Sequence, residues 1–262
     1  MAELHYVSTG DGPDPVVLIH GFGCDHTDWD AQVAHLAPTR RVIAVDLPGH
    51  GASPAGPESC SIERYGAAVA ELMRALALPQ ATVVGHSLGC RVAVEAALQA
   101  PEHVKALILV DGSQFAAAMA ATLRDMFARP DGFQTLQSSM FRDMFAPHAE
   151  EATAFRVIAR AQAMPRAVGE KMLLDLQRYD VTRWTASLGC LRVPVLALQT
   201  TYANEKRERK SLRQGQSSPY LDMLRDAVPD ATVEIIADTG NFPQLEQPAL
   251  TNAAFDRFLA SL

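Results

Sequence analysis

The stretch Gly85-His86-Ser87-Leu88-Gly89 places a serine between two glycines, at a point where a predicted strand gives way to a predicted helix. Residues 82–84 are β-branched, and the apolar residues after Arg91 have helical spacing. Strand, sharp turn and helix are the context in which G-x-S-x-G presents a nucleophile. Side chains on the flanking residues would clash at so tight a reversal, and the serine is expected in strained backbone geometry. Ser87 is the candidate nucleophile.

A nucleophilic serine needs three kinds of helper. A base must take the hydroxyl proton, an acid must orient that base, and N–H donors must meet the developing oxyanion. These groups come from distant parts of a chain, so the elements that bring them together have to be identified first.

Alternating strands and helices dominate most of the chain. Short apolar runs of the kind found in strands buried on both faces are separated by segments with helical spacing. The sequence therefore predicts an α/β fold, with a mainly parallel sheet and helices on both faces. The predicted strands cover residues 4–8, 15–20, 41–45, 82–84, 104–110, 193–198 and 232–236.

The pattern changes in the middle of the chain, where residues 115–188 contain no strand signal. Helical segments broken at Pro130, Pro147 and Pro165 predict an insertion of three or four helices. The expected division is a core of residues 1–112 and 190–262 with a helical insertion at 113–189. Most apolar residues of the insertion should pack within it, while the adaptable methionines Met119, Met140 and Met144 are candidates to line a pocket.

Composition narrows the classes of function. The chain has 262 residues, 48% of them hydrophobic, and a formal net charge of -7, which argues against a nucleic-acid partner. No apolar run reaches membrane-spanning length, so no membrane association is expected. The four cysteines are scattered without metal-ligand spacing, and we expect no metal site and a reducing, cytoplasmic location. The charged run 205–210 is expected to be a solvated loop.

Several motifs occur together and in a characteristic order. They are His20-Gly-Phe-Gly, Asp46-x-Pro-Gly-His-Gly, the Ser87 motif, the helical insertion and Gly240-Asn-Phe-Pro-Gln-Leu-Glu-x-Pro. In this combination the chain resembles the α/β-hydrolase superfamily over nearly its whole length, in particular serine esterases and lactonases with a helical cap, or lid. The resemblance implies catalysis without a cofactor or metal. It also implies an oxyanion hole formed by the backbone N–H groups of Phe22 and Leu88.

The resemblance also locates the base, and there the chain departs from the family. The catalytic histidine is expected just after the last strand, at the position of Asn241. None of the eight histidines lies beyond residue 148, and an amide has no basic lone pair to accept the proton of Ser87. Because the surrounding residues fit an active enzyme, we interpret Asn241 as an inactivating His-to-Asn substitution, of the kind made to trap a ligand, rather than as a natural pseudoenzyme feature.

Two carboxylates compete for the role of orienting acid. The usual place follows the strand that ends at Leu198, but the first carboxylate there is Glu205. Some relatives place the acid after the preceding strand, where Asp111 lies. We favour Asp111, because catalytic residues of open α/β sheets gather at the carboxyl ends of strands. His86 and Phe242, beside the nucleophile and the base position, are further pocket candidates.

The leading hypothesis is a serine hydrolase that cleaves a carboxylic ester or lactone of an apolar small molecule through an acyl-enzyme at Ser87. As written, the chain should be nearly inactive because of Asn241. Two alternatives remain open at this point. One is a non-catalytic ligand-binding protein on the same fold, and the other is a cofactor-independent dioxygenase, in which the serine would be expendable.

Overall fold

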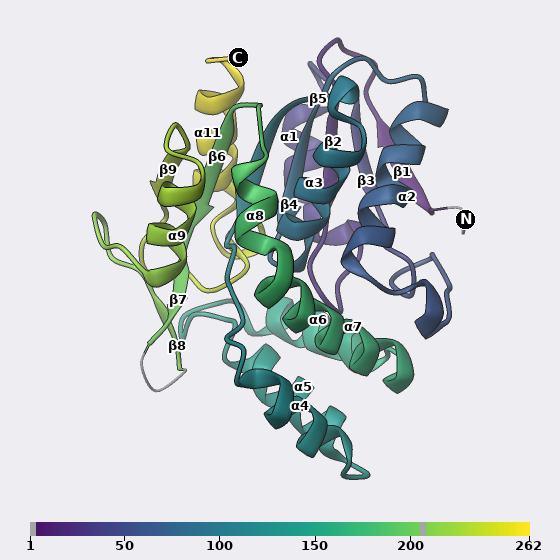
Figure 1. Cartoon of the computed structure of the whole chain (residues 1–262). Helices are drawn as coiled ribbons and strands as arrows, with labels where there is room; N and C mark the ends of the chain where they lie inside the picture. Colours follow the sequence, from purple (N-terminus) through teal and green to yellow (C-terminus); the bar gives the residue numbers. More distant parts are fainter. Residues whose placement is uncertain (1–3, 205–207) are drawn as a thin grey trace.

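A seven-stranded sheet forms the centre of the computed structural model, which describes residues 4–204 and 208–262. The strand order is β1-β3-β2-β4-β5-β6-β9, and every neighbouring pair is parallel except β1 with β3 (Figure 1). The mainly parallel sheet predicted from the sequence is confirmed. The strands are β1 (Tyr6–Thr9), β2 (Val16–Ile19), β3 (Val42–Val45), β4 (Ala81–His86), β5 (Val104–Val110), β6 (Val195–Gln199) and β9 (Thr232–Ile235).

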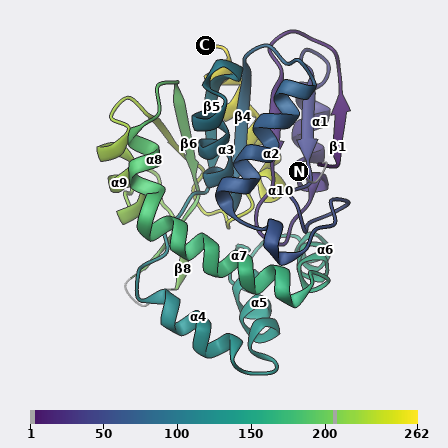
Figure 2. The same ribbon diagram turned by 45° about the vertical axis from the view of Figure 1, so that its right-hand side comes forward.

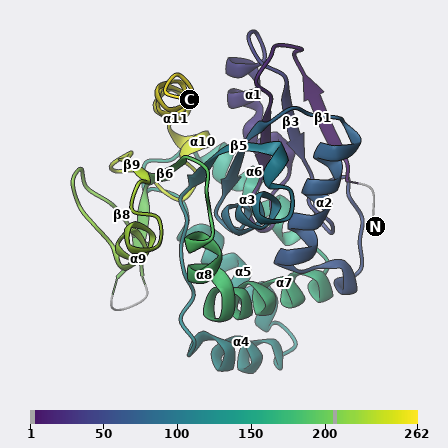
Figure 3. The ribbon, with the colours of Figure 1, turned by 45° about the horizontal axis from the view of Figure 1, so that its top comes forward.

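Helices cover both faces of this sheet (Figure 3). One face carries α2 (Ile62–Ala75), α3 (Leu88–Gln99), α8 (Thr185–Gly189) and α9 (Pro219–Ala227). The other carries α1 (Asp30–Leu36), α10 (Pro243–Glu246) and α11 (Pro248–Leu259). Short 3₁₀ helices cover His26–Trp29, Pro57–Ser59 and Pro101–His103. None of the helices in the described ranges is both long and apolar enough to cross a bilayer.

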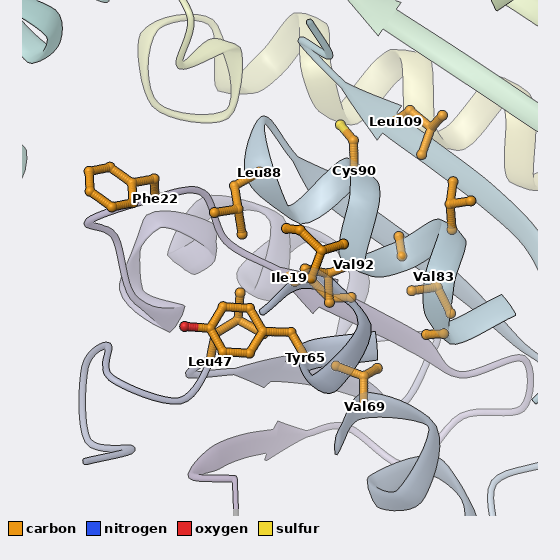
Figure 4. Packing of buried hydrophobic residues seen from close by; sticks show 14 of the residues in the cluster. Ile19, Phe22, Leu47, Tyr65, Val69, Val83, Leu88, Cys90, Val92 and Leu109 are labelled. Carbon is orange, nitrogen blue, oxygen red and sulfur yellow. The ribbon is translucent and has the colours of Figure 1, made fainter. Parts of the chain in front are cut away.

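The core has two layers because successive strand residues point to opposite faces. Val83 packs with the helices on the α3 side, whereas Val84 packs with Trp29 and Phe255 on the α11 side. Figure 4 shows part of the first layer, where side chains of β2, β4 and α3 meet. Strands β2, β3 and β4 are buried along their whole length, which explains their continuous apolar runs.

The insertion forms a helical cap below the carboxyl ends of the strands (Figures 1 and 2). It begins with α4 (Met119–Phe127), α5 (Gly132–Arg142) and α6 (Glu151–Gln162). The next helix, α7 (Arg166–Tyr179), continues through a π-helical segment (Asp180–Trp184) into α8. The predicted breaks near Pro130, Pro147 and Pro165 lie between these helices.

One expectation about the loops was wrong. Arg209 and Lys210, expected in a solvated loop, belong to β8 (Arg209–Ser211), which pairs antiparallel with β7 (Thr201–Ala203). The Arg209 guanidinium donates to Thr201 Oγ1 at 2.6 Å, so a contact within the fold outweighs the local preference of a charged run. Residues 205–207 of that run, including Glu205, lie outside the described residues.

Candidate active site

Ser87 occupies the turn between β4 and α3 in a strained conformation. Its φ of 52° and ψ of -109° are unusual for a residue with a side chain, and its N–H donates to Val110 O at 2.9 Å. The turn requires both flanking glycines. A Cβ at Gly85 would lie 2.1 Å from Gly89 O, and a Cβ at Gly89 would lie 2.5 Å from Ile19 O. The chain therefore holds Ser87, half-buried, at the carboxyl end of β4.

The two expected oxyanion donors lie on segments next to Ser87. Leu88 is the first residue of α3, where the helix dipole favours negative charge, and Phe22 lies on the loop after β2 (Figure 4). That loop passes directly against Ser87, because a Cβ at Gly21 would come within 3.4 Å of Ser87 Cβ. The segments of both predicted donors thus meet at Ser87.

Asp111 and Asn241 are in direct contact. Asn241 Nδ2 donates to Asp111 Oδ2 at 2.5 Å, and both side chains are almost fully buried. Asp111 follows β5 and its N–H donates to Leu198 O, whereas Asn241 follows β9 at the same end of the sheet. The structure therefore brings the residue after β5 to position 241.

The Asp111 carboxylate is held by a dense set of donors. Oδ1 accepts from the Thr200 and Thr201 N–H groups at 3.0 and 2.7 Å and from Gln199 Nε2 at 2.9 Å. Oδ2 accepts from Thr201 Oγ1 at 2.6 Å, and Arg209 lies at 3.4 Å. These donors fix the carboxylate and leave Oδ2 directed at Asn241.

Asn241 donates to the Asp111 carboxylate as an imidazole N–H would, but its amide has no basic nitrogen. Its Oδ1 is buried without a hydrogen-bond partner among the described residues. Its backbone oxygen accepts from His86 Nε2 at 2.7 Å, so His86 supports the segment that carries position 241. Burial lowers the pKa of His86 to about 4, which keeps the ring neutral at pH 7.

The cap is fastened to the segment around Asn241. Asn241 N–H donates to Met144 O at 2.6 Å. The Glu246 carboxylate accepts from Ala146 N–H at 3.0 Å and from Gly240 N–H at 3.1 Å. One carboxylate therefore joins the cap to the loop that carries the base position.

Apolar side chains of the cap also cover this loop. Phe242 stacks on Phe145, with ring centroids 4.7 Å apart and planes 15° apart, and it also lies near Phe141 and His86. Of the methionines proposed to line a pocket, Met144 contacts position 241 through its backbone, and Met140 is a partly buried residue of α5. Met119 begins α4, which packs on α5 and α7 in the outer part of the cap (Figure 2).

A cavity of about 630 Å³ lies between the cap and the β7–β8 hairpin, next to this site. Thr201, which binds Asp111, and Gly240, which precedes Asn241, both line it. Charges of both signs line its wall, namely Arg142, Arg209 and Lys210 together with Asp143 and Glu208.

Arg91 is a buried residue that sequence reasoning missed. Its guanidinium donates to Ser87 O at 2.9 Å, to Ser113 O at 2.5 Å and to both oxygens of Asp180 at 2.8 and 2.9 Å. It thereby ties the nucleophile turn to the start and the end of the cap. A signal was present in the sequence, since Arg91 is a charged residue one helical turn after Ser87 on a mainly apolar helix.

Fold, motif and site geometry agree with the family that the chain matches. A family model described as the alpha/beta hydrolase family matches residues 16–254, and the chain belongs to this family. The chain is 28% identical, over 98% of its length, to the dihydrolipoyllysine-residue acetyltransferase component of the acetoin cleaving system of Cupriavidus necator. It spans 66% of that relative's length, and 64% of the corresponding protein of Pseudomonas putida.

Other similar proteins are esterases of comparable length. The chain is 29% identical to a pimeloyl-[acyl-carrier protein] methyl ester esterase of Serratia marcescens, over the full length of both. Among solved structures, an esterase from Thermogutta terrifontis superposes with a TM-score of 0.82 at 24% identity, covering 98% of this chain and 93% of the other. The structural likeness establishes the α/β-hydrolase fold.

Proposed function

We propose that this chain carries the site of a serine hydrolase that cleaves a carboxylic ester or lactone of an apolar small molecule. The single observation that carries the proposal is the 2.5 Å contact from Asn241 Nδ2 to the buried carboxylate of Asp111. A histidine at position 241 would place an imidazole N–H toward the same carboxylate, as an orienting acid requires. The ester chemistry is supported by the esterases to which the chain is similar.

With histidine at position 241, the mechanism begins with attack of Ser87 Oγ on the substrate carbonyl carbon. The imidazole takes the hydroxyl proton, and the N–H groups of Leu88 and Phe22 stabilise the oxyanion. Collapse of the tetrahedral intermediate breaks the carbonyl carbon–alkoxy oxygen bond, and the imidazolium protonates the departing alcohol. Water, deprotonated by the same imidazole, then attacks the acyl-enzyme and releases the acid.

With asparagine at position 241, this proton transfer has no acceptor. Loss of one member of such a triad costs about 10⁴- to 10⁶-fold in turnover, while the oxyanion donors and substrate binding remain. We therefore propose that the chain as written binds its substrate and turns it over very slowly. Asn241 then replaces a catalytic histidine in an otherwise competent site.

The direct test is hydrolysis of p-nitrophenyl esters of increasing acyl length by Asn241→His. We expect a rise of at least about 10³-fold in kcat/KM over the chain as written, and loss of that rise on adding Ser87→Ala. If Asn241→His gains no rate on any ester or lactone, the hydrolase proposal is wrong.

The alternative is a ligand-binding protein without catalysis, which Asn241 itself favours because the buried amide offers no basic nitrogen. In that case a ligand would bind saturably at the site, and Asn241→His would add no turnover of that ligand.

A further inference from the structure

A second group of side chains, separate from Ser87, surrounds the buried carboxylate of Asp46. His5 Nδ1 lies 2.8 Å from Asp46 Oδ2, and His26 Nδ1 lies 3.0 Å from Oδ1 and 3.1 Å from Oδ2. The three potential ligand atoms all lie within 4.8 Å of one another. The hydrolysis proposed above uses none of the three residues.

The fold brings this cluster together from three segments. His5 precedes β1 and Asp46 follows β3, and the antiparallel pairing continues past the strands, since Asp46 N–H donates to His5 O at 2.9 Å. His26 begins the 3₁₀ helix that follows the β2 loop. Three chain segments thus converge on one carboxylate.

Asp46 is held in place independently of the two imidazoles. Its Oδ1 accepts from the backbone N–H of His26 at 2.8 Å, and its Oδ2 accepts from the backbone N–H of Ala52 at 2.9 Å. Carboxylates that bind metal ions are oriented by such supporting hydrogen bonds. Since both donors are backbone groups, a change of the His26 side chain leaves them in place.

We propose that His5, His26 and Asp46 bind a divalent transition-metal ion, with Zn²⁺ as the best match and water as the fourth ligand. Two imidazoles and one carboxylate form a donor set that suits zinc, cobalt or nickel rather than magnesium or calcium. Tetrahedral bonds of about 2.0–2.1 Å put neighbouring ligand atoms about 3.3 Å apart. The contacts of 2.8–3.1 Å to Asp46 would widen by a few tenths of an ångström, and the two imidazole ligand atoms, which lie within 4.8 Å of each other, would take the same tetrahedral spacing.

When the His5 and His26 rings are neutral, binding of the ion requires each ring to change its tautomer. No proton has to leave either ring. Each Nδ1–H that donates to Asp46 moves to Nε2, so that the Nδ1 lone pair faces the ion. The side chains of His5 and His26 are 38% and 24% exposed, and Asp46 is buried, so an ion and its water can enter from the solvent side. His20 stays outside the ligand set, because its two ring nitrogens contact Gly21 O and Leu47 N–H.

A bound ion would join the start of β1 to the loops after β2 and β3. The β2 loop also carries Phe22, four residues before His26. Metal binding at this site does not depend on the proposed hydrolysis. The experiment below therefore measures metal binding and not activity.

The test is calorimetric titration of the chelator-treated protein with Zn²⁺, with Co²⁺ absorption as a measure of tetrahedral coordination. We expect one site per chain, at least tenfold weaker binding by His5→Ala and by His26→Ala, and loss of the site in the double variant. His35→Ala is the matched control. It removes a histidine that contacts the Asp256 carboxylate at 2.9 Å on the exposed surface, with no second imidazole in the pair.

Thermal unfolding gives an independent reading. Zn²⁺ should raise the unfolding temperature of the chain and of His35→Ala, but not that of the double variant. If His26→Ala fails to fold, His5→Ala, which alters the residue just before β1, decides the test alone. Absence of stoichiometric binding, or equal binding by the chain and the His5 variant, would overturn the proposal.

Discussion

In the proposed mechanism, Asn241 differs from a catalytic histidine in one property, the basic ring nitrogen that would accept the proton of Ser87. The amide keeps an N–H donor toward Asp111, so the local geometry survives, but it offers no basic nitrogen to the nucleophile. The surrounding contacts are those of a residue with a defined orientation. Its N–H binds Met144 O, its carbonyl binds His86, and its side chain binds Asp111. Three hydrogen bonds therefore fix the position at which we propose that the catalytic base is missing.

At this scale the role of Asp111 is testable in the Asn241→His background. Asp111→Asn should lower kcat by about 10³- to 10⁴-fold, because an amide neither fixes the tautomer of the imidazole nor stabilises its charged form. KM should change far less, since Asp111 contacts the residue at position 241 and is not proposed to contact the substrate. Steady-state kinetics on a p-nitrophenyl ester measures both quantities.

Glu205→Gln in the same background is the matched control, because Glu205 was the competing candidate. We expect it to leave kcat within a few fold. Retained activity in Asp111→Asn together with loss in Glu205→Gln would reverse the assignment.

At the scale of elements, a buried ion pair connects α3, the helix that follows Ser87, to the cap. Arg91 on α3 and Asp180 at the end of α7 are fully buried, and the guanidinium lies over the Trp184 ring at 5.2 Å. Asp180 also accepts from Phe115 N–H at 2.7 Å, near the first residues of the cap. Both ends of the insertion therefore meet one turn away from Ser87.

We predict that Arg91→Ala lowers the free energy of unfolding by about 3–5 kcal/mol, because it leaves the Asp180 charge buried without its partner. Arg91→Lys should recover only part of this loss, since an ammonium cannot reproduce the planar set of donors. Urea denaturation followed by circular dichroism measures both effects.

Arg257→Ala is the comparison for an exposed pair. Arg257 contacts Glu234 at 2.6 Å on the surface, and its loss should shift the denaturation midpoint little. Equal shifts for Arg91→Ala and Arg257→Ala would contradict the anchoring role of Arg91.

At the scale of the whole molecule, buried histidines link stability to pH. Burial lowers the pKa of His50 and of His86 to about 4 each, whereas an unfolded chain has a histidine pKa of about 6.5. Between these values the unfolded state binds more protons than the folded state. The stabilisation is therefore complete above about pH 6.5 and is lost as the pH falls toward 4.

The quantity to compare between the chain and His50→Gln is the slope of the free energy of unfolding against pH, near pH 5. Replacing His50 by glutamine should reduce the proton uptake on unfolding by about one proton, or about 1.4 kcal/mol per pH unit. Urea denaturation at several pH values gives this slope. An unchanged slope in His50→Gln would show that His50 is not kept neutral by the fold.

The sheet and the cap could be predicted because their signals are local. Buried parallel strands such as β2 and β5 are short apolar runs, and the cap helices end near prolines. The pairings within the site are not local in the sequence. Asp111 and Asn241 are 130 residues apart. The resemblance to the α/β-hydrolase superfamily, together with the rule that functional residues gather at strand ends, brought them into one hypothesis.

The partners of Arg91 and Arg209 could not be assigned from sequence for the same reason. Their carboxylate partners lie 89 and 98 residues away, and each arginine alone is also compatible with a solvated surface. The hairpin that carries Arg209 is formed by pairing of β7 with β8. A run of charged residues contains no strand signal that would predict this pairing. The positions of these two arginines are therefore determined by tertiary contacts and not by the local preference of the sequence.

The central claim is that position 241 is the place from which Ser87 is activated, and the most direct test needs no knowledge of the substrate. The rate of covalent addition of a fluorophosphonate to Ser87, followed by mass spectrometry, compares the chain as written with Asn241→His. We predict at least about 10²-fold faster addition in Asn241→His, because a positioned base removes the hydroxyl proton, and no addition after Ser87→Ala. Equal rates in the two proteins would contradict the account.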